Sequence, residues 1–333
     1  MRSPPSRVNA CVNYRYELTP EVPTPGIGAS IGGQRAVIDT ALALRAAGRA
    51  FALAVVVDAE GSTYRKAGAL ALIADDGLRV GVISGGCLEA GLDLLGRDAL
   101  VADAPCLNVF DTRSDDDLIF GSGSGCRGRM HVVAVPVRPD RISPVFERVA
   151  KAWRAREDVT IDLADLAPTL FSTGRVAIRA PTTLLAIGAG PETPPLLRIA
   201  RTLGWYTSVA EHRDGLLDGE RMRDADVVTH GRPTAALREL AGQRIDAAIV
   251  MTHLADADAE ALAELARSDV RYVGLLGPPA RRDELLARLG DEEREALRGR
   301  LHAPVGLRLG GDGPEAIAIA IAAELQQVFE PIR

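Results

Sequence analysis

Two cysteines of the sequence lie in glycine-rich segments of its N-terminal half, residues 84–89 and 123–128. A thiolate is a soft ligand that suits soft metals and sulfur chemistry, and neighbouring glycines leave room for a bound molecule. Each cysteine alone also has a simpler interpretation, as a small buried apolar side chain. The loop residues expected to contact a ligand are Ser84, Gly85, Gly86, Cys87, Glu89, Gly125, Cys126 and Gly128.

The residues around each thiol favour reactivity. Cys87 is expected within the first turn of a helix predicted over residues 88–101, where the helix dipole stabilises a thiolate. Glu89 is either a plain helix N-terminal charge or a proton acceptor that orients a ligand, and Arg127 is expected to hold a sulfur or an anion. No Cys-x-x-Cys pair is present, which disfavours zinc, and Cys11 and Cys106 are predicted to be incidental.

A glycine turn in the C-terminal half is typical of nucleotide binding. Gly188 and Gly190 follow a predicted strand and precede a helix, and Glu211 ends the next predicted strand. Such a turn brings a pyrophosphate to a helix N-terminus, while the acid accepts from a ribose hydroxyl. Pro191 removes one amide, and Thr193 replaces the third glycine. The ligand is therefore a nucleotide such as NAD(P) or a phosphorylated pterin, or else the turn is purely structural.

His253 is a further candidate for ligand binding. It follows the predicted strand 247–251 and so is expected at the carboxyl edge of the sheet, where open α/β folds bind ligands. The alternative is an exposed loop histidine or a helix-cap partner for Thr252. Asp256 and Asp258 are interpreted as N-terminal helix charges rather than metal ligands.

The elements that carry these residues define an α/β protein with a mixed α+β N-terminal domain and a C-terminal Rossmann-like domain with a parallel sheet. From residue 183 on, apolar strands alternate with glycine turns and helices, and a last amphipathic helix is expected over 314–329. The N-terminal half combines helices 37–44 and 88–101 with strands 51–57, 107–110 and 129–135 and an Asp-Gly hairpin between apolar stretches 68–74 and 78–83. We predict a flexible extension over 1–33, the N-terminal domain over 34–138, a connector over 139–180 and the Rossmann-like domain over 181–333.

Composition narrows the function classes. The net charge is -6, with 25% charged residues and no basic tract, which argues against nucleic acid. Residues 1–33 hold no apolar run long enough for a signal peptide or membrane span, so a cytoplasmic, reducing location without disulfides is expected.

The motifs resemble, in order, those of the XdhC/CoxI family of xanthine dehydrogenase accessory factors over roughly residues 35–330. The N-terminal matches run through Gly61–Lys66, Gly81–Glu89, Asp111 and 121–128; the C-terminal ones include 188–191, 203–205, 251–253, 274–277 and 304–307. The resemblance implies an accessory factor rather than an enzyme. Such a factor binds the molybdenum cofactor, protects it and supports its sulfuration. It further implies delivery to a molybdenum hydroxylase apoenzyme, contact with a cysteine desulfurase, and a homodimer.

In the resemblance, Cys87 and Cys126 occupy the family's cysteine positions and are the expected molybdenum contacts. The chain departs from the family at Leu254, at Pro278-Pro279 and, more mildly, at Glu211. Two other functions stay open: an NAD(P)-dependent oxidoreductase, although no Tyr-x-x-x-Lys relay is present, and a regulatory scaffold that binds no cofactor.

Overall fold

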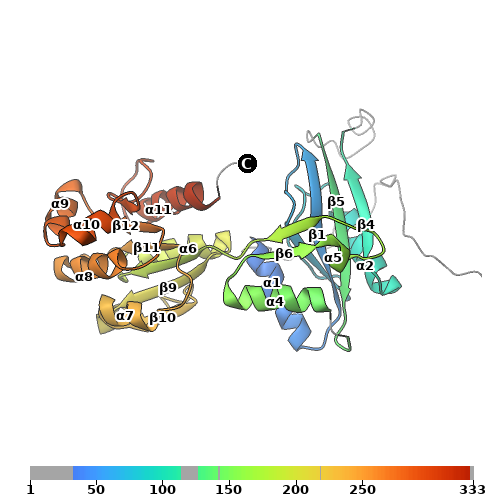
Figure 1. Cartoon of the computed structure of the whole chain (residues 1–333), viewed down its shortest axis with the longest axis horizontal. Coiled ribbons are helices and arrows are strands. Elements are labelled where there is room, and N and C mark those ends of the chain that lie inside the picture. Colours follow the sequence, from blue (N-terminus) through green and yellow to red (C-terminus); the bar gives the residue numbers. More distant parts are fainter. Residues whose placement is uncertain (1–32, 114–126, 142, 218, 331–333) are drawn as a thin grey trace, which may run out of the picture. The chain divides into compact units, whose positions relative to one another are not determined.

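The computed structural model describes residues 33–113, 127–141, 143–217 and 219–330. Contacts between residues divide the chain into two compact units, Met1–Ala180 and Pro181–Arg333. Figure 1 labels the elements of both units.

The first unit is built on a five-stranded antiparallel sheet. Its order is β3 (Arg79–Val80), β2 (Leu70–Ala74), β1 (Phe51–Gly61), β5 (Gly128–Val137) and β4 (Cys106–Asp111). The first seven residues of β1 are all buried, because α1 (Gly33–Ala46) and α4 (Pro144–Ala155) cover one face and α2 (Glu89–Ala102) covers the other. The Asp-Gly hairpin is confirmed: β2 pairs with β3, and Gly77 has a φ of 88°.

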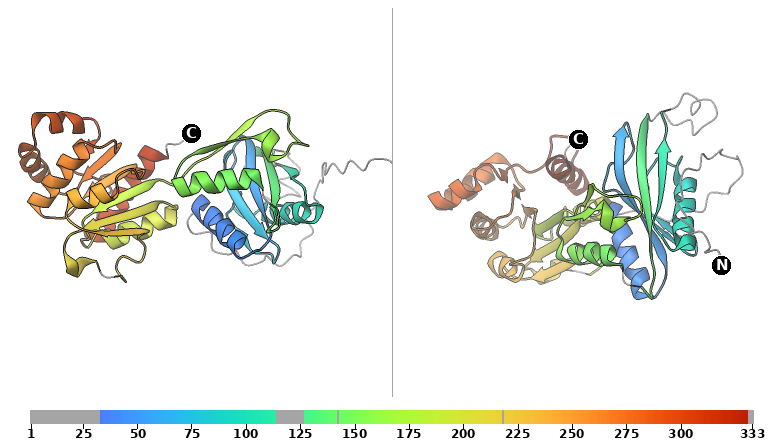
Figure 2. Two further views of the ribbon diagram at one scale, coloured as in Figure 1. Left: turned by 60° about the horizontal axis from the view of Figure 1, so that its bottom comes forward. Right: turned by 45° about the vertical axis from the view of Figure 1, so that its right-hand side comes forward.

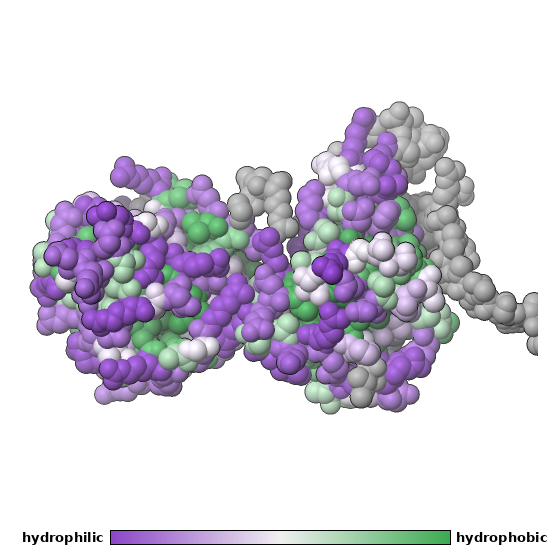
Figure 3. All heavy atoms as spheres, in the orientation of Figure 1, coloured by the Kyte–Doolittle hydropathy of each residue, from purple (hydrophilic) through white to green (hydrophobic). Residues whose placement is uncertain are grey.

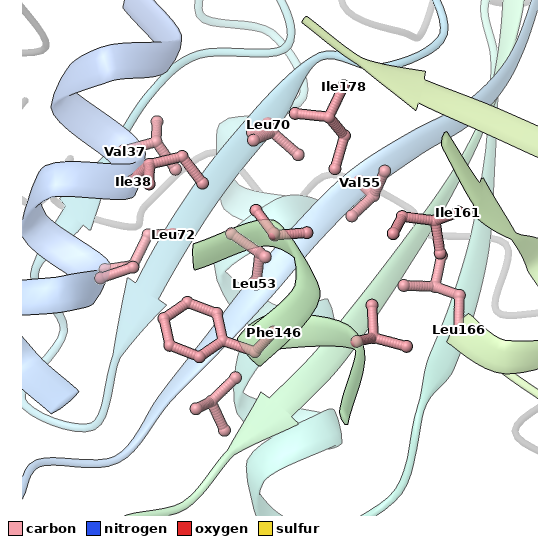
Figure 4. Packing of buried hydrophobic residues seen from close by; sticks show 14 of the residues in the cluster. Val37, Ile38, Leu53, Val55, Leu70, Leu72, Phe146, Ile161, Leu166 and Ile178 are labelled. Atoms are coloured by element: carbon pink, nitrogen blue, oxygen red, sulfur yellow. The ribbon is translucent and has the colours of Figure 1, made fainter. Parts of the chain in front are cut away.

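Residues 139–180, predicted to be a connector, instead complete the core of the first unit. Phe146 of α4 meets Phe51 of β1 edge to face, with ring centroids 5.5 Å apart. Ile161 of β6 (Val159–Asp162) and Ile178 of β7 (Arg175–Ile178) join the same cluster as Phe146 (Figure 4), with the short α5 (Leu163–Leu166) between them. The prediction was wrong because the apolar stripe of α4 needs a surface to cover, and the apolar face of β1 is that surface.

Loss of a helix cap in this segment is therefore expected to destabilise the first unit. Ser143 precedes α4, and its side chain accepts a hydrogen bond from the backbone N–H of Phe146. We expect Ser143→Ala to lower the free energy of unfolding by about 1 kcal/mol. In a Trp205→Phe background, urea titration followed by Trp153 fluorescence measures this, and Ser143→Asn, which restores the acceptor, should recover most of the loss. Equal stability of the first unit in wild type and Ser143→Ala would show that the Ser143 cap contributes nothing to it.

The second unit contains a six-stranded parallel sheet. Its order is β10 (Val227–His230), β9 (Tyr206–Glu211), β8 (Thr183–Ile187), β11 (Ala247–Val250), β12 (Tyr272–Leu275) and β13 (Leu301–His302). This is the doubly wound order, in which the direction of strand addition reverses between β8 and β11. The predicted Rossmann-like sheet is confirmed, and so is the mixed α/β class of the chain.

Helices cover both faces of this sheet, as the two views of Figure 2 show. One apolar cluster lies beneath α6 (Thr193–Leu203) and α11 (Pro314–Phe329). The other lies beneath α7 (Pro233–Glu239), α8 (Ala255–Ala266), α9 (Pro279–Ala287) and α10 (Asp291–Leu297). A short 3-10 helix, Asp214–Leu216, follows β9.

Hydrophilic residues cover most of the face drawn in Figure 3 on both units. Among the described residues, no helix combines the length and apolar character that a membrane crossing requires.

Candidate functional site

Three connections of the first unit meet at one end of its sheet. β1 ends at Gly61 directly opposite Gly128, where β5 begins, and β4 ends at Asp111 opposite Arg129. β3 runs in the same direction as β1, so the loop 81–88 that leaves β3 is directed toward this same end. The Cys87 loop is therefore directed toward the end where β4 stops and β5 starts. Gly125 and Cys126, which stand between those two strands in the sequence, lie outside the described residues.

A buried hydrogen-bond network shapes the Cys87 loop. The Ser84 hydroxyl donates to Glu89 Oε2 at 2.6 Å, and the backbone N–H groups of Gly86 and Leu88 donate to Ser84 Oγ at 3.2 and 3.0 Å. Glu89 also accepts from the N–H of Leu88 at 3.2 Å, and it is only 5% exposed. Ser84 and Glu89 thus hold the loop, and the Glu89 carboxylate is committed to it rather than facing a ligand.

Cys87 lies just outside the helix. α2 begins at Glu89 with Leu88 as its N-cap, so the expectation that Cys87 sits within the first turn is wrong by two residues. The sequence predicted an earlier start of the helix because its apolar pattern includes Leu88. In the structure Leu88 is the N-cap residue rather than the first residue of the helix. The thiol is partly exposed, and an added Cβ at Gly85 or Gly86 would meet no atom within 4 Å. The space beside Gly85 and Gly86, the two residues that precede Cys87, is therefore open.

A buried ion pair fixes α2 beneath this loop. Arg79 Nη1 lies 2.7 Å from Asp93 Oδ2 and donates to the backbone oxygen of Glu89 at 3.3 Å. Both side chains are at most 12% exposed, so the start of the helix is tied to β3 by a guanidinium with little access to water. This rigid base determines where the loop presents Cys87.

The other loop residues have separate roles. Gly128 is packed tightly, because an added Cβ would lie 2.5 Å from Thr63 Cγ2 and 2.6 Å from the oxygen of Ser62. A glycine is therefore needed here for the close packing of the two segments. Cys106 is buried in β4, with its Sγ 3.7 Å from the oxygen of Ala104, in keeping with the expected incidental thiol. Cys11 lies outside the described residues.

The second unit assembles its candidates where β8 and β11 separate. Gly188 has a φ of 119°, and an added Cβ would lie 2.4 Å from the oxygen of Met251. Only glycine at this position therefore lets the turn approach the end of β11 so closely. His253 adopts a φ of 63°, and its Nε2 lies 3.2 Å from Glu192 Oε2. An added Cβ at Gly190 would meet that same Nε2 at 3.2 Å. The structure therefore brings Gly188, Gly190 and His253 together, as predicted for the carboxyl edge.

Buried Asp258 holds the backbone before His253. It accepts from the Thr252 N–H at 3.1 Å and from the Thr252 hydroxyl at 2.6 Å, and it pairs with Arg281 at 2.7 Å. Sequence reasoning placed Asp258 correctly in the first turn of α8 but missed this role and the partnership of Glu192 with His253. Thr252 and Asp258 are 6 residues apart, which is within reach of local sequence patterns. Glu192 and His253 are 61 residues apart, which is beyond that reach.

Glu211 is closed to a ribose. Its carboxylate accepts from the N–H groups of Ala189, His212 and Arg213 at 2.8–2.9 Å and pairs with the Arg213 guanidinium at 2.6 Å. Burial by itself would raise the pKa of this carboxyl, but the hydrogen bonds from Arg213 and the three amides outweigh it and lower the pKa to about 2. The prediction that Glu211 contacts a ligand conflicts with this arrangement, because Arg213 and the amides already occupy its acceptor sites.

The helix that follows the turn also lacks the usual donors for a pyrophosphate. Pro194 and Pro195 in its first turn, like Pro191 in the turn itself, have no N–H. The Ala189 amide is taken by Glu211, and the Thr193 amide donates to the oxygen of Gly190. The Glu192 carboxylate lies 3.0 Å from the position of an added Cβ at Gly190, and its negative charge would repel a phosphate bound beside that glycine. These residues do not fit a dinucleotide bound in the way that such turns ordinarily bind one.

The fold and site define a class of protein: an antiparallel-sheet unit that presents a thiol loop, followed by a doubly wound unit whose glycine turn is internally braced. Residues 44–111 match the profile described as "XdhC and CoxI family", and residues 184–325 match that of the "XdhC Rossmann domain".

Known proteins extend these matches to most of the chain. A Bacillus subtilis (strain 168) protein, named as a probable subunit of xanthine dehydrogenase, is 30% identical over 83% of this chain and 92% of its own length. A Bacillus halodurans protein, whose crystal structure is described as that of a xanthine dehydrogenase, is 29% identical with a TM-score of 0.75, over 89% of this chain and 96% of that one. The Escherichia coli (strain K12) protein YqeB, named as uncharacterized, is 27% identical over 84% of this chain. The matched part covers 43% of the length of YqeB. The chain belongs to the XdhC/CoxI family, which confirms the resemblance noted in the sequence.

Proposed function

We propose that this chain binds the molybdenum cofactor, protects it, supports its sulfuration and delivers it to a molybdenum hydroxylase of the xanthine dehydrogenase type. The observation that carries the proposal is the Cys87 loop, which the Ser84 and Glu89 hydrogen bonds hold open beside a partly exposed thiol. The names of the Bacillus relatives, which refer to xanthine dehydrogenase, support the choice of partner.

The donor set of this loop fits the cofactor. A thiolate is a soft ligand suited to a soft or sulfur-bearing metal centre, and the unfilled space at Gly85 and Gly86 admits a bulky ligand. When bound, the cofactor supplies a metal centre that can carry a terminal sulfur. Cys87 would contact that metal, while Ser84 and Glu89 keep the thiol in place; Cys126 remains the predicted second contact.

The same proposal names the other partners. A cysteine desulfurase would supply the sulfur, and a homodimer in the cytoplasm would be the working form. A reducing compartment suits this chemistry because Cys87 must remain a free thiol, as it is in the structure. We propose an accessory role without catalytic turnover.

Co-expression with a molybdenum hydroxylase tests the function directly. We expect the purified chain to carry molybdenum and pterin in near-equal amounts, measured by mass spectrometry of the metal and fluorescence of the oxidised pterin. The hydroxylase should contain less sulfurated cofactor when the chain is omitted. A chain that pulls down the hydroxylase without any pterin would instead identify a regulatory scaffold. Saturable NADH binding followed by fluorescence would favour the oxidoreductase hypothesis over ours.

A further inference from the structure

The segment Gly61–Lys66, between β1 and β2, is fixed in place although it lies at the surface. The Ser62 N–H donates to the oxygen of Arg127 at 3.1 Å. Lys66 Nζ donates back to the oxygen of Gly61 and to Thr63 Oγ1, each at 3.2 Å. Gly61 has a φ of 69°, and an added Cβ there would lie 2.6 Å from the oxygen of Arg127. This segment is therefore braced against the residue that follows Cys126.

The strand register places the segment on one face of the sheet. Met130, Val132 and Ala134 of β5 point into the core beneath α2. Side chains alternate along a strand, so an added Cβ at Gly128 would point to the same face. Thr63 and the Ser62 backbone occupy that position, 2.5 and 2.6 Å from it. The segment thus folds over the end of the face that α2 covers.

The Cys87 loop leads into α2 on the same face and is directed toward the same end. Gly91, in the first turn of α2, lies so close to β4 that an added Cβ would be 2.8 Å from Phe110 Cε1. Phe110 pairs with Met130, two residues from Gly128. Cys87 comes four residues before Gly91, in the loop that leads into the N-terminal end of α2. Two segments far apart in sequence, 61–66 and 84–88, are therefore both directed toward the same end of the face that α2 covers.

Tyr64 stands on this braced segment with its side chain largely in solvent. The residue is 59% exposed, and it is the one aromatic residue among the large apolar side chains exposed in the described part of the chain. A tyrosine held on a rigid backbone offers a flat face for stacking at low conformational cost. An exposed aromatic face and a soft thiol directed toward the same end of one sheet match a ligand that joins a planar heteroaromatic ring to a metal.

We infer that Tyr64 is the stacking platform for the planar pterin ring of the ligand whose metal Cys87 contacts. This inference rests on the proposed function and deepens it, because it assigns the ring and the metal to two different segments of the same unit. The ring then contributes to affinity independently of the metal. A pterin without metal should therefore bind at Tyr64 even when Cys87 is changed.

Titration of the full-length chain with free pterin, followed by fluorescence anisotropy of the pterin, tests this. We expect Tyr64→Ala to raise the Kd about tenfold, as removal of one stacking partner does elsewhere, and Tyr64→Phe to stay within about twofold of wild type. Val101→Ala, at an 87% exposed residue of α2, is the matched surface control and should leave the Kd unchanged. Cys87→Ser should also leave the Kd for free pterin unchanged while it lowers bound molybdenum.

The outcomes separate the two proposals. Wild-type affinity in Tyr64→Ala, with thermal unfolding unchanged, overturns the stacking role and leaves the proposed function intact. Should Tyr64→Ala keep pterin affinity but lose the hydroxylase in a pull-down, Tyr64 is a protein contact and the inference fails. A wild-type chain that binds neither free pterin nor the molybdenum cofactor contradicts both.

Discussion

Cys87→Ser is expected to deplete co-purified molybdenum about tenfold or more while the first unit stays folded. Serine keeps the size of the side chain and the hydrogen bonds of the loop, which involve Ser84, Glu89 and backbone groups rather than the thiol. It replaces a soft sulfur by a hard, protonated oxygen, which is a poor ligand for a soft centre. Molybdenum per chain, measured by mass spectrometry after co-expression with the hydroxylase, gives the result.

Two further variants make this test specific. Cys106→Ser changes sulfur to oxygen at a buried position of β4 and should retain wild-type molybdenum once its folding is verified. Cys126→Ser should resemble Cys87→Ser if both thiols contact the metal as predicted. Wild-type molybdenum in both Cys87→Ser and Cys126→Ser would show that neither thiol contacts the metal.

The second large effect concerns Glu211. We expect Glu211→Gln to lower the free energy of unfolding of the second unit by about 3 kcal/mol at pH 7. That figure is the free-energy equivalent of lowering the pKa of the carboxyl from 4.5 to about 2 in the folded unit. Glutamine has one acceptor oxygen, and its NH₂ group would face the Arg213 guanidinium and the Ala189 amide, which are donors.

The direction of the pKa shift determines how the destabilisation by Glu211→Gln changes with pH. The pKa of Glu211 is lower in the folded unit than in the unfolded chain, so its stabilisation is complete above about pH 4.5 and disappears as the pH falls toward 2. The difference between wild type and Glu211→Gln should therefore shrink steadily over that range. A difference that stays constant from pH 7 to pH 3 would contradict the assignment.

The chain's own tryptophans allow the measurement to be restricted to one unit. Trp153 lies in the first unit and Trp205 in the second, and the sequence has no others. In a Trp153→Phe background, urea unfolding followed by fluorescence reports the second unit alone. Glu220→Gln is the control, since its carboxylate is 76% exposed and its pairing with Arg223 should contribute under about 1 kcal/mol.

The sequence by itself determined the elements whose signals are local. The last helix, expected over residues 314–329, is α11 (Pro314–Phe329), because Gly313 and Pro314 mark its start and its apolar periodicity persists to Phe329. The strands and turns of the second unit also follow local cues, and their alternation fixes a parallel sheet. The motif order was sufficient to identify the family, which the comparisons confirm.

Only the tertiary structure decided which groups satisfy one another. Glu211 has the type and position of a ribose-binding acid, yet in the folded unit Arg213 and three amides, one of them the distant Ala189 amide, already bond its carboxylate. Residues 144–178 join the first core because an apolar surface of β1 lies within their reach. Thr63 meets Gly128 through strand register. Spacing along the chain predicts local conformation, whereas contacts between distant segments depend on the packing of the whole unit.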